Sequence, residues 1–154
     1  RDSISVGVLD GDDIVHIVRS RYSHISSLSI RPGARMPLYC TASGRIWLAN
    51  LPAEALDQYL QRTELRSITP YTLTDAAQFR EELQKINRQG YCMVDGEYEV
   101  GMRVLGVPLR DRNGELKAAM ALTTHASRME INEMRQRYLT PLYEAQALLK
   151  PVLG

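Results

Sequence analysis

The chain has 154 residues, the size of one domain, and a chain of this length buries roughly two thirds of its unfolded surface. Its 19 basic and 18 acidic residues leave a net charge of +1, so the overall charge does not indicate binding to nucleic acid or to an anionic membrane. No apolar run approaches the ~20 residues of a membrane-spanning helix, and we expect neither a signal peptide nor a membrane partner. Cys40 and Cys92 lack the spacing of a metal site and indicate reduced thiols, so we expect a cytoplasmic protein.

The start of the chain has the pattern of β-strands. Residues 3–9 alternate apolar with small side chains, which predicts a strand. A turn at residues 10–13 and an apolar run at residues 14–19 predict that this strand forms a hairpin. We expect a third strand at residues 24–30, ended by a Pro-Gly pair.

Helical patterns follow. We expect a helix at residues 41–51 after a loop of small residues, and a second short helix at residues 53–61 after Pro52. Residues 75–89 have an amphipathic period, and Gly90 provides a C-terminal stop.

The remaining segments predict three strands and a long final helix. The strands are expected at residues 91–94, 99–108 and 115–123, the last two forming a hairpin. Apolar positions from residue 131 to residue 152 predict a helix that Pro141 should kink. Six strands with helices between and after them indicate an α+β domain, in which one antiparallel sheet carries helices on its faces.

Residues 33–52 carry the most specific pattern in the chain. Thr41, Ala42, Ser43 and Gly44 form a small-residue loop that runs directly into an apolar helix. Such a loop lets a ligand approach main-chain N–H groups, and the helix N-terminus adds a partial positive charge. The place therefore suits a carboxylate or a phosphate. The alternative is structural: Thr41 or Ser43 caps the helix, and Gly44 relieves crowding.

The same residues resemble a known family. The run PLYCTASGRIWLA resembles the P-L-H-A-T-A-x-G-K-A-x-L-A motif of the effector-binding domain of IclR-type bacterial transcription regulators, with matches at Pro37, Leu38, Thr41, Ala42, Gly44, Leu48 and Ala49. Tyr39 and Cys40 replace the usual His and Ala. A second stretch, from Arg88 through Glu97 to Pro108, resembles the family's R-x-G-Y…E…G-x-R-x-x-A-x-P pattern. The variant at residues 39–41 is most similar to the branch that controls degradation of aromatic acids such as protocatechuate and 4-hydroxybenzoate.

The resemblance covers almost the whole chain and implies a GAF/PAS-like domain, with a central antiparallel sheet of about six strands, flanking helices and a long C-terminal helix. Residues 1–154 would form a single effector-binding domain. A winged helix-turn-helix domain that precedes it in the family would contact DNA, and this chain would only sense. The resemblance further implies a homodimer or tetramer, no cofactor, and transcriptional control of catabolic genes rather than catalysis.

Family members hold a small carboxylated effector against the motif loop and the middle strands. Carried onto this sequence, the main-chain donors are the N–H groups of Ala42 and Ser43. The implied ligand-binding residues are Leu28, Met36, Tyr39, Thr41, Ala42, Ser43, Val94, Met102, Val104, Ala121 and Thr123. Val94, Val104 and Ala121 stand where binders of small keto acids carry polar residues, which favours a larger, aromatic acid. The orienting polar groups could then be Thr123, Thr124, Tyr39 or Arg19, and the alternative is that the apolar positions are ordinary core.

Other interpretations use the same residues differently. Cys40 could be the nucleophile of a thiol enzyme with His125 as base, because a helix N-terminus can lower a thiol pKa. The chain could also be a purely structural oligomerisation domain. Arg19 and Arg21 could bind a carboxylate or form a solvated strand edge. The three histidines, at positions 16, 24 and 125, match no local zinc motif, so we expect no metal.

Overall fold

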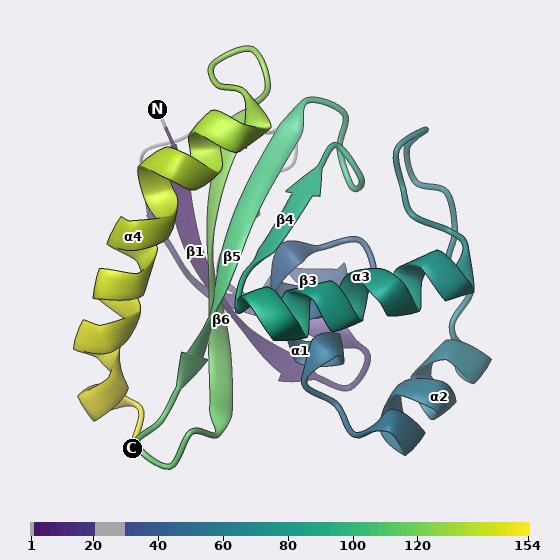
Figure 1. Ribbon diagram of the computed structural model, residues 1–154, viewed down its shortest axis with the longest axis horizontal. Helices are drawn as coiled ribbons and strands as arrows, with labels where there is room; N and C mark the ends of the chain where they lie inside the picture. Colours follow the sequence, from purple (N-terminus) through teal and green to yellow (C-terminus); the bar gives the residue numbers. More distant parts are fainter. Residues whose placement is uncertain (1, 21–29) are drawn as a thin grey trace.

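The computed structural model describes residues 2–20 and 30–154, which fold around one six-stranded sheet (Figure 1). Every neighbouring pair of strands is antiparallel, and the strand order is β3-β2-β1-β6-β5-β4. The strands are β1 (Ser3–Asp10), β2 (Asp13–Arg19), β3 (Arg35–Pro37), β4 (Cys92–Asp95), β5 (Met102–Arg110) and β6 (Leu116–His125). The helices are α1 (Ala42–Ala49), α2 (Ala53–Arg62), α3 (Ala76–Gln89), α4 (Ile131–Leu149) and the 3-10 turn η1 (Lys150–Val152). The expected α+β class with a six-stranded antiparallel sheet is therefore confirmed.

One edge strand among the described residues was not predicted. It is β3 (Arg35–Pro37), and it pairs with β2. The predicted strand at residues 24–30 falls largely outside the described residues, and Ile30 is not in a strand. Three residues are too few to show an alternating pattern. Arg35 in this strand forms ion pairs with Asp10 and Asp13 in the β1–β2 hairpin, at 2.6 and 3.1 Å.

The start of β5 also differs from the prediction, by three residues. Glu99, Val100 and Gly101 form a turn rather than the first residues of the strand. Gly96 and Gly101 both have positive φ angles, +69° and +84°, which other residues rarely adopt. A strand prediction based on the hydrophobic pattern does not detect that these two positions need positive φ angles.

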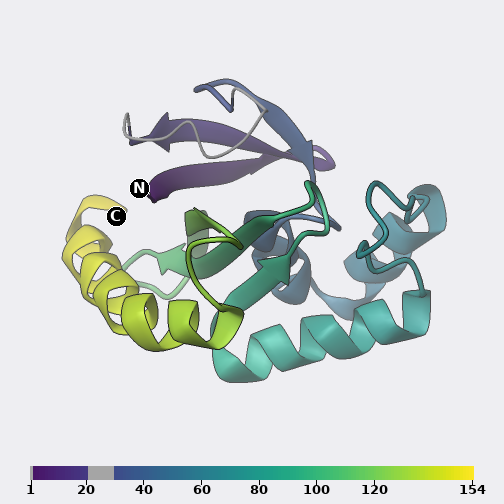
Figure 2. The ribbon, with the colours of Figure 1, turned by 90° about the horizontal axis from the view of Figure 1, so that it is seen from above.

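The two faces of the sheet are covered by different helices (Figure 1). Helix α4 packs on one face, where its Met134 and Leu142 join a cluster with Leu105, Val107 and Leu122. Helix α1 packs on the other face and α3 lies outside it. Figure 2 shows that the sheet is curled, with the β1–β2 hairpin on one side and β4 on the other. The curl gives the α1 face a concave shape.

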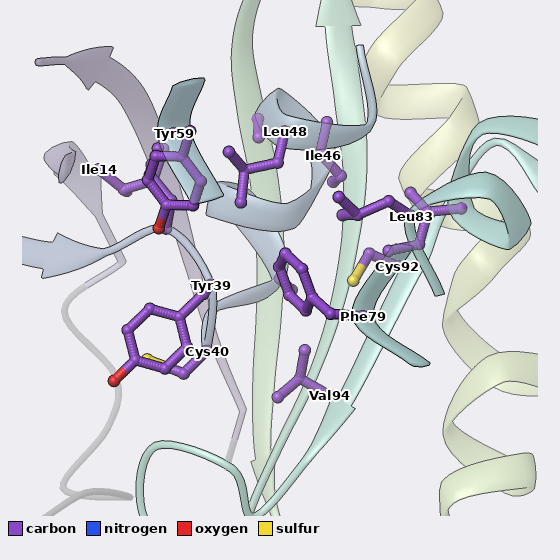
Figure 3. Packing of buried hydrophobic residues seen from close by; sticks show 14 residues of the cluster. Ile14, Tyr39, Cys40, Ile46, Leu48, Tyr59, Phe79, Leu83, Cys92 and Val94 are labelled. Atoms are coloured by element: carbon purple, nitrogen blue, oxygen red, sulfur yellow. The ribbon is translucent and has the colours of Figure 1, made fainter. Parts of the chain in front are cut away.

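Helix α1 is held in the concave face by apolar contacts (Figure 3). Ile46 and Leu48 of α1 pack with Phe79 and Leu83 of α3 and with Val94 of β4, all at most 3% exposed. Under α1, Gly106 of β5 allows close approach of the helix, because an added Cβ would lie 3.0 Å from the Ile46 Cδ1 and 3.2 Å from the Ala42 Cβ. The N-terminal end of α1 is thereby fixed against the middle of the sheet.

Helix α4 is continuous through Pro141. The Tyr138 hydroxyl donates a hydrogen bond to Asp2, which connects the helix to the start of the chain. None of the helices in residues 2–20 and 30–154 is long and apolar enough to cross a bilayer.

Candidate functional site

A cavity lies between the concave face of the sheet and the N-terminal end of α1. Its volume is about 40 Å³, which is room for about three water molecules at ~10–15 Å³ each. The sequence-predicted residues that line it are Met36, Thr41, Ala42, Ser43, Val94, Met102, Val104, Ala121 and Thr123. Further lining residues are Ser3, Ser5, His16, Arg19, Ile30, Cys40 and Tyr98. The structure thus brings most of the predicted positions together, although they come from six different elements or loops.

Thr41 fixes the helix end that faces this cavity. It has the extended conformation of an N-cap, and its Oγ1 accepts a hydrogen bond from the N–H of Gly44 at 3.2 Å. The first intrahelical bond runs from the N–H of Arg45 to the carbonyl of Thr41, at 3.0 Å. The N–H groups of Ala42 and Ser43 therefore have no acceptor within the helix. The capping interpretation of Thr41 is correct, and it leaves these two amides on the cavity wall.

A β-bulge shapes the opposite part of the wall. In the β1–β2 pair, Val6 lies opposite Val18 and Gly7 lies opposite His16, so Ile17 has no partner. Because of this extra residue, Arg19 shares a face with His16 instead of pointing away from it. Alternation without the bulge would have placed Val18 in the cavity, and Val18 is 55% exposed.

The bulge turns Arg19 toward the small polar side chains of β1. Its Nε donates to the Ser3 Oγ at 3.1 Å, and its Nη1 donates to the carbonyl of Ile30 at 2.8 Å. Ser5 is its cross-strand partner. Arg19 is therefore a half-buried cavity residue rather than a solvated strand edge, whereas Arg21 lies outside the described residues.

His16 is buried in the same wall and is only partly satisfied. Its Nε2 lies 3.2 Å from the Met36 Sδ, while its Nδ1 is buried without a hydrogen-bond partner in the described structure. Burial lowers the pKa of His16, and the positive charge of Arg19 lowers it further. The imidazole is therefore neutral at pH 7.

The cavity is electrostatically suited to an anion. Among the described residues that line it there is no Asp or Glu, whereas Arg19 and the amide end of α1 both contribute positive potential. Apolar side chains, among them Val94, Val104 and Ala121, form another part of its surface. This combination suits a ligand that has an apolar body and an acidic group.

Among the predicted ligand residues that the structure describes, Tyr39 is the one outside the cavity lining. Tyr39 packs in the α1-side core at 5% exposure, and its hydroxyl donates to the carbonyl of Arg66 at 3.1 Å (Figure 3). The neighbouring residue Cys40 lines the cavity instead. Leu28 lies outside the described residues.

The Cys40 thiol is unreactive in this buried position. Burial raises the pKa of its thiol to about 12, which outweighs the opposite effect of the Arg45 charge. The alternative thiol-enzyme interpretation needs the helix end to lower this pKa, and desolvation has the opposite and larger effect. Thr124, considered as an orienting group, is fully buried with an unpartnered hydroxyl and lies outside the cavity lining.

The thiols provide a direct test. At pH 8 we expect iodoacetamide to label Cys40 and Cys92 of the folded protein at least about 1,000-fold more slowly than the unfolded chain, because the thiol pKa of each is raised to about 12. Mass spectrometry after timed quenching measures both rates. Rapid labelling of Cys40 alone would contradict the assigned pKa.

A buried ion pair connects the two motifs of the sequence. Arg45 of α1 donates to both carboxylate oxygens of Glu97 at 2.6 and 2.5 Å, and its Nε donates to the carbonyl of Tyr39 at 2.7 Å. Glu97 also accepts a hydrogen bond from the N–H of Leu73 at 2.8 Å. The sequence indicated no partner for Arg45, and the alternation of Asp95, Glu97 and Glu99 predicted one solvated face, which is wrong for Glu97 because its side chain is 11% exposed and paired with Arg45. The sequence signal that could have linked Arg45 to Glu97 is that each lies in one of the two family motifs.

The described residues contain no cluster of three His, Cys, Asp or Glu side chains suited to a metal ion. His16 lines the cavity, whereas His125 bonds to Ser127 next to the β6 end. His24 lies outside the described residues.

Comparison with known proteins identifies the fold and the family. The family model described as the bacterial transcriptional regulator IclR C-terminal domain matches residues 1–148. The chain belongs to the IclR family. A Pca regulon regulatory protein of Pseudomonas putida is 37% identical to it over 145 residues, covering 94% of this chain and 50% of the relative. The IclR-type chain described here therefore spans about half the length of that curated relative.

Solved structures of IclR-type regulators have the same fold. The inducer-binding domain of a PobR transcription factor from Acinetobacter, a double mutant in complex with 3-hydroxybenzoic acid, superposes with a TM-score of 0.91 at 26% identity, covering 97% of this chain and 88% of that one. The IclR protein of Thermotoga maritima gives a TM-score of 0.89 at 30% identity, covering 99% and 62%. These relatives are transcription regulators and not enzymes, so the IclR assignment makes the chain a regulatory domain.

Proposed function

We propose that the chain senses a small aromatic carboxylic acid, which it binds in the cavity between α1 and the sheet. The observation that carries this proposal is the composition of the wall: amides of a helix N-terminus and a guanidinium around an apolar surface, with no carboxylate among the described lining residues. The acid's carboxylate accepts hydrogen bonds from the N–H groups of Ala42 and Ser43. Its ring packs on Val104 and Ala121.

Polar groups of the β1–β2 hairpin bind a second substituent of the ring. Ser5 and Arg19 lie side by side on the cavity face, and both can donate to a ring hydroxyl or a further acidic group. The cavity of about 40 Å³ must widen for a ring to enter. Met102 lines it, and an unbranched methionine side chain repacks readily.

The relatives support the class of ligand. One is a Pca regulon regulatory protein, and a similar solved domain holds 3-hydroxybenzoic acid. In this proposal residues 1–154 are a single effector-binding domain of a cytoplasmic regulator whose winged helix-turn-helix domain contacts DNA. The purely structural interpretation gives no reason for a polar, unsatisfied cavity wall beside an apolar floor.

Binding acts on transcription through a homodimer or tetramer. An acid can shift the arrangement of subunits only by the difference between its affinities for the two arrangements. A micromolar affinity corresponds to about −8 kcal/mol, of which a difference of ~1–3 kcal/mol is enough to switch a population. The genes that the regulator controls would then be those for catabolism of the sensed acid.

Thermal unfolding against a panel of acids tests the proposal. We expect protocatechuate or 4-hydroxybenzoate to raise the Tm in a saturable way, because a ligand that binds only the native state stabilises it. Pyruvate and glyoxylate should leave the Tm unchanged, since they cannot fill the apolar surface. A response to the small keto acids alone would overturn the aromatic class, and silence across the panel, including β-ketoadipate, would favour the structural interpretation.

Replacing Arg19 tests the wall of the cavity. We expect Arg19→Gln to weaken binding of 4-hydroxybenzoate by about 10- to 100-fold, as expected for the loss of one charge-assisted hydrogen bond of ~1.5–3 kcal/mol. Isothermal titration calorimetry measures the affinity. Arg35→Gln is the matched control, because Arg35 pairs with Asp10 and Asp13 outside the cavity. Equal affinities for the two variants would exclude Arg19 from the site.

A further inference from the structure

We infer that His16 contacts the bound acid and takes up a proton when the acid binds. This inference rests on the proposed function and adds a property of the site that the function does not require. It makes the domain's response to its ligand depend on pH.

The geometry places His16 beside the amide end of α1. Gly7 lies directly opposite His16 in the β1–β2 pair, and a Cβ built on Gly7 would lie 3.8 Å from the Ser43 Cβ. Directly paired residues of an antiparallel sheet hold their side chains ~4.5–5.5 Å apart on the same face. The imidazole therefore lies next to the first turn of α1, where the proposed carboxylate binds.

The buried Nδ1 of His16 has no hydrogen-bond partner in the described structure, and protonation of the ring would give this nitrogen a proton to donate to the acid. A neutral imidazole has one N–H. In one tautomer the Nε2 donates to the Met36 sulfur and the Nδ1 is a bare acceptor; in the other the Nδ1 can donate and the Nε2 has no proton to give to the sulfur. A bare acceptor repels a carboxylate. An imidazolium has a donor on both nitrogens, so it keeps the Met36 contact and satisfies the buried Nδ1 with the oxygen of the acid.

The direction of the linkage follows from the charges around the ring. Without an acid, burial and Arg19 hold the pKa of His16 below its ordinary value, so the ring is neutral at pH 7. A carboxylate in contact with the ring favours the charged form and raises this pKa. Affinity therefore increases as pH falls through the raised pKa, and it levels off below the lowered one.

The other groups around His16 keep their charge over this range. Arg19 on β2 stays cationic, and β1 and β3 contribute Ser5, Gly7 and Met36, which do not titrate. Cys40 and Tyr98 also line the cavity, and both have raised pKa values, so they stay neutral. Within the described part of the cavity, His16 is the group whose charge can change between about pH 5.5 and 8.

Calorimetric titration of 4-hydroxybenzoate in buffers of different ionisation enthalpy measures the protons taken up. We expect an uptake approaching one proton per site, and an affinity that falls by up to tenfold per pH unit as pH rises between about 6 and 8. The benzoate carboxyl stays ionised over this range, since carboxyl groups titrate near pH 4. If 4-hydroxybenzoate does not bind, the panel acid with the largest Tm increase takes its place.

Two variants make the test specific. His16→Asn places an amide N–H near the position of the Nδ1 but cannot titrate, so it should bind with no proton uptake and no pH dependence. His125→Asn is the matched control, because His125 bonds to Ser127 outside the cavity, and it should keep the wild-type uptake. NMR titration of the His16 ring in the wild-type protein, with and without the acid, should show a pKa increase on binding.

The outcomes separate this inference from the function beneath it. Binding of an acid by the wild-type protein with no proton uptake, or full uptake by His16→Asn, overturns the role of His16 and leaves the sensor function standing. An unchanged ring pKa in the NMR titration has the same meaning. Failure of every acid in the panel to bind overturns both.

Discussion

Replacing Arg45 by alanine is expected to reduce the free energy of unfolding by about 3–5 kcal/mol, the loss typical of removing one partner of a buried ion pair. The side chains of Arg45 and Glu97 are only 2% and 11% exposed, so the Glu97 carboxyl group would be left buried without its cationic partner. Arg45 also lies over the Phe79 ring at 5.4 Å, and this cation–π contact is lost with it. Urea denaturation followed by circular dichroism measures the change.

An exposed ion pair of the same chemistry serves as the control. Arg62 donates to both carboxylate oxygens of Asp12 at 2.8 and 2.7 Å, but the two side chains are about half exposed, at 53% and 46%. Surface pairs contribute little because water solvates the separated charges almost as well. Arg62→Ala should leave the urea midpoint close to the wild-type value. Similar losses in Arg45→Ala and Arg62→Ala would mean that burial of the first pair is not what stabilises the domain.

Glu97→Gln separates the charge from the hydrogen bonds. The amide keeps the size of the side chain and can still accept from the N–H of Leu73, but it leaves the Arg45 guanidinium buried without a counter-charge. We expect its loss of stability to approach that of Arg45→Ala. A double variant, Arg45→Met with Glu97→Gln, should lose less than the sum of the single losses, because neither charge is then left unpaired.

Gly44→Ala is the second substitution for which we expect a large effect, about 3 kcal/mol or more of unfolding free energy. An added Cβ would lie 2.3 Å from the carbonyl oxygen and 2.4 Å from the Cα of Leu38, and 2.6 Å from the Thr41 Oγ1. Two of these atoms belong to the backbone, which cannot turn aside as a side chain can. The motif loop must therefore move away from α1, which breaks the Thr41 cap and displaces the Ala42 and Ser43 amides.

Thermal unfolding and acid binding should both respond to this change. Gly114→Ala is the control, since Gly114 has nothing within 4 Å of an added Cβ and a positive φ of +85°. Its cost is backbone strain alone, about 1 kcal/mol, and it should bind 4-hydroxybenzoate as the wild-type protein does. If Gly44→Ala retained wild-type stability and affinity, the close packing of the loop on α1 would have no functional consequence.

Local sequence patterns predicted the parts of the fold that depend on neighbouring residues. The helix after Thr41, the amphipathic helix α3 and its Gly90 stop, and the β5–β6 hairpin follow from caps, periods and turns within a few residues of one another. The motif loop could be located for the same reason, because small residues before an apolar helix form one continuous segment.

The parts that sequence reasoning missed depend on distant partners. The bulge at Ile17 exists only relative to β1, and it decides that Arg19 rather than Val18 faces the cavity. A half-buried strand ordinarily buries its apolar side chains, whereas in β1 Ser3 and Ser5 are buried and Ile4 is 39% exposed. Two-sided burial of a central strand weakens any inference from a single apolar stripe.

The Arg45–Glu97 pair also constrains how the sequence can change over generations. The two residues are 52 positions apart, so separate mutations must alter them, and whichever comes first leaves a lone buried charge. A lineage that changes one position would lose about 3–5 kcal/mol of folding stability before the second change could compensate. In an alignment of relatives that share this packing, we therefore expect a basic residue at position 45 wherever position 97 is acidic. Relatives that lack one of the two charged residues should lack the other as well.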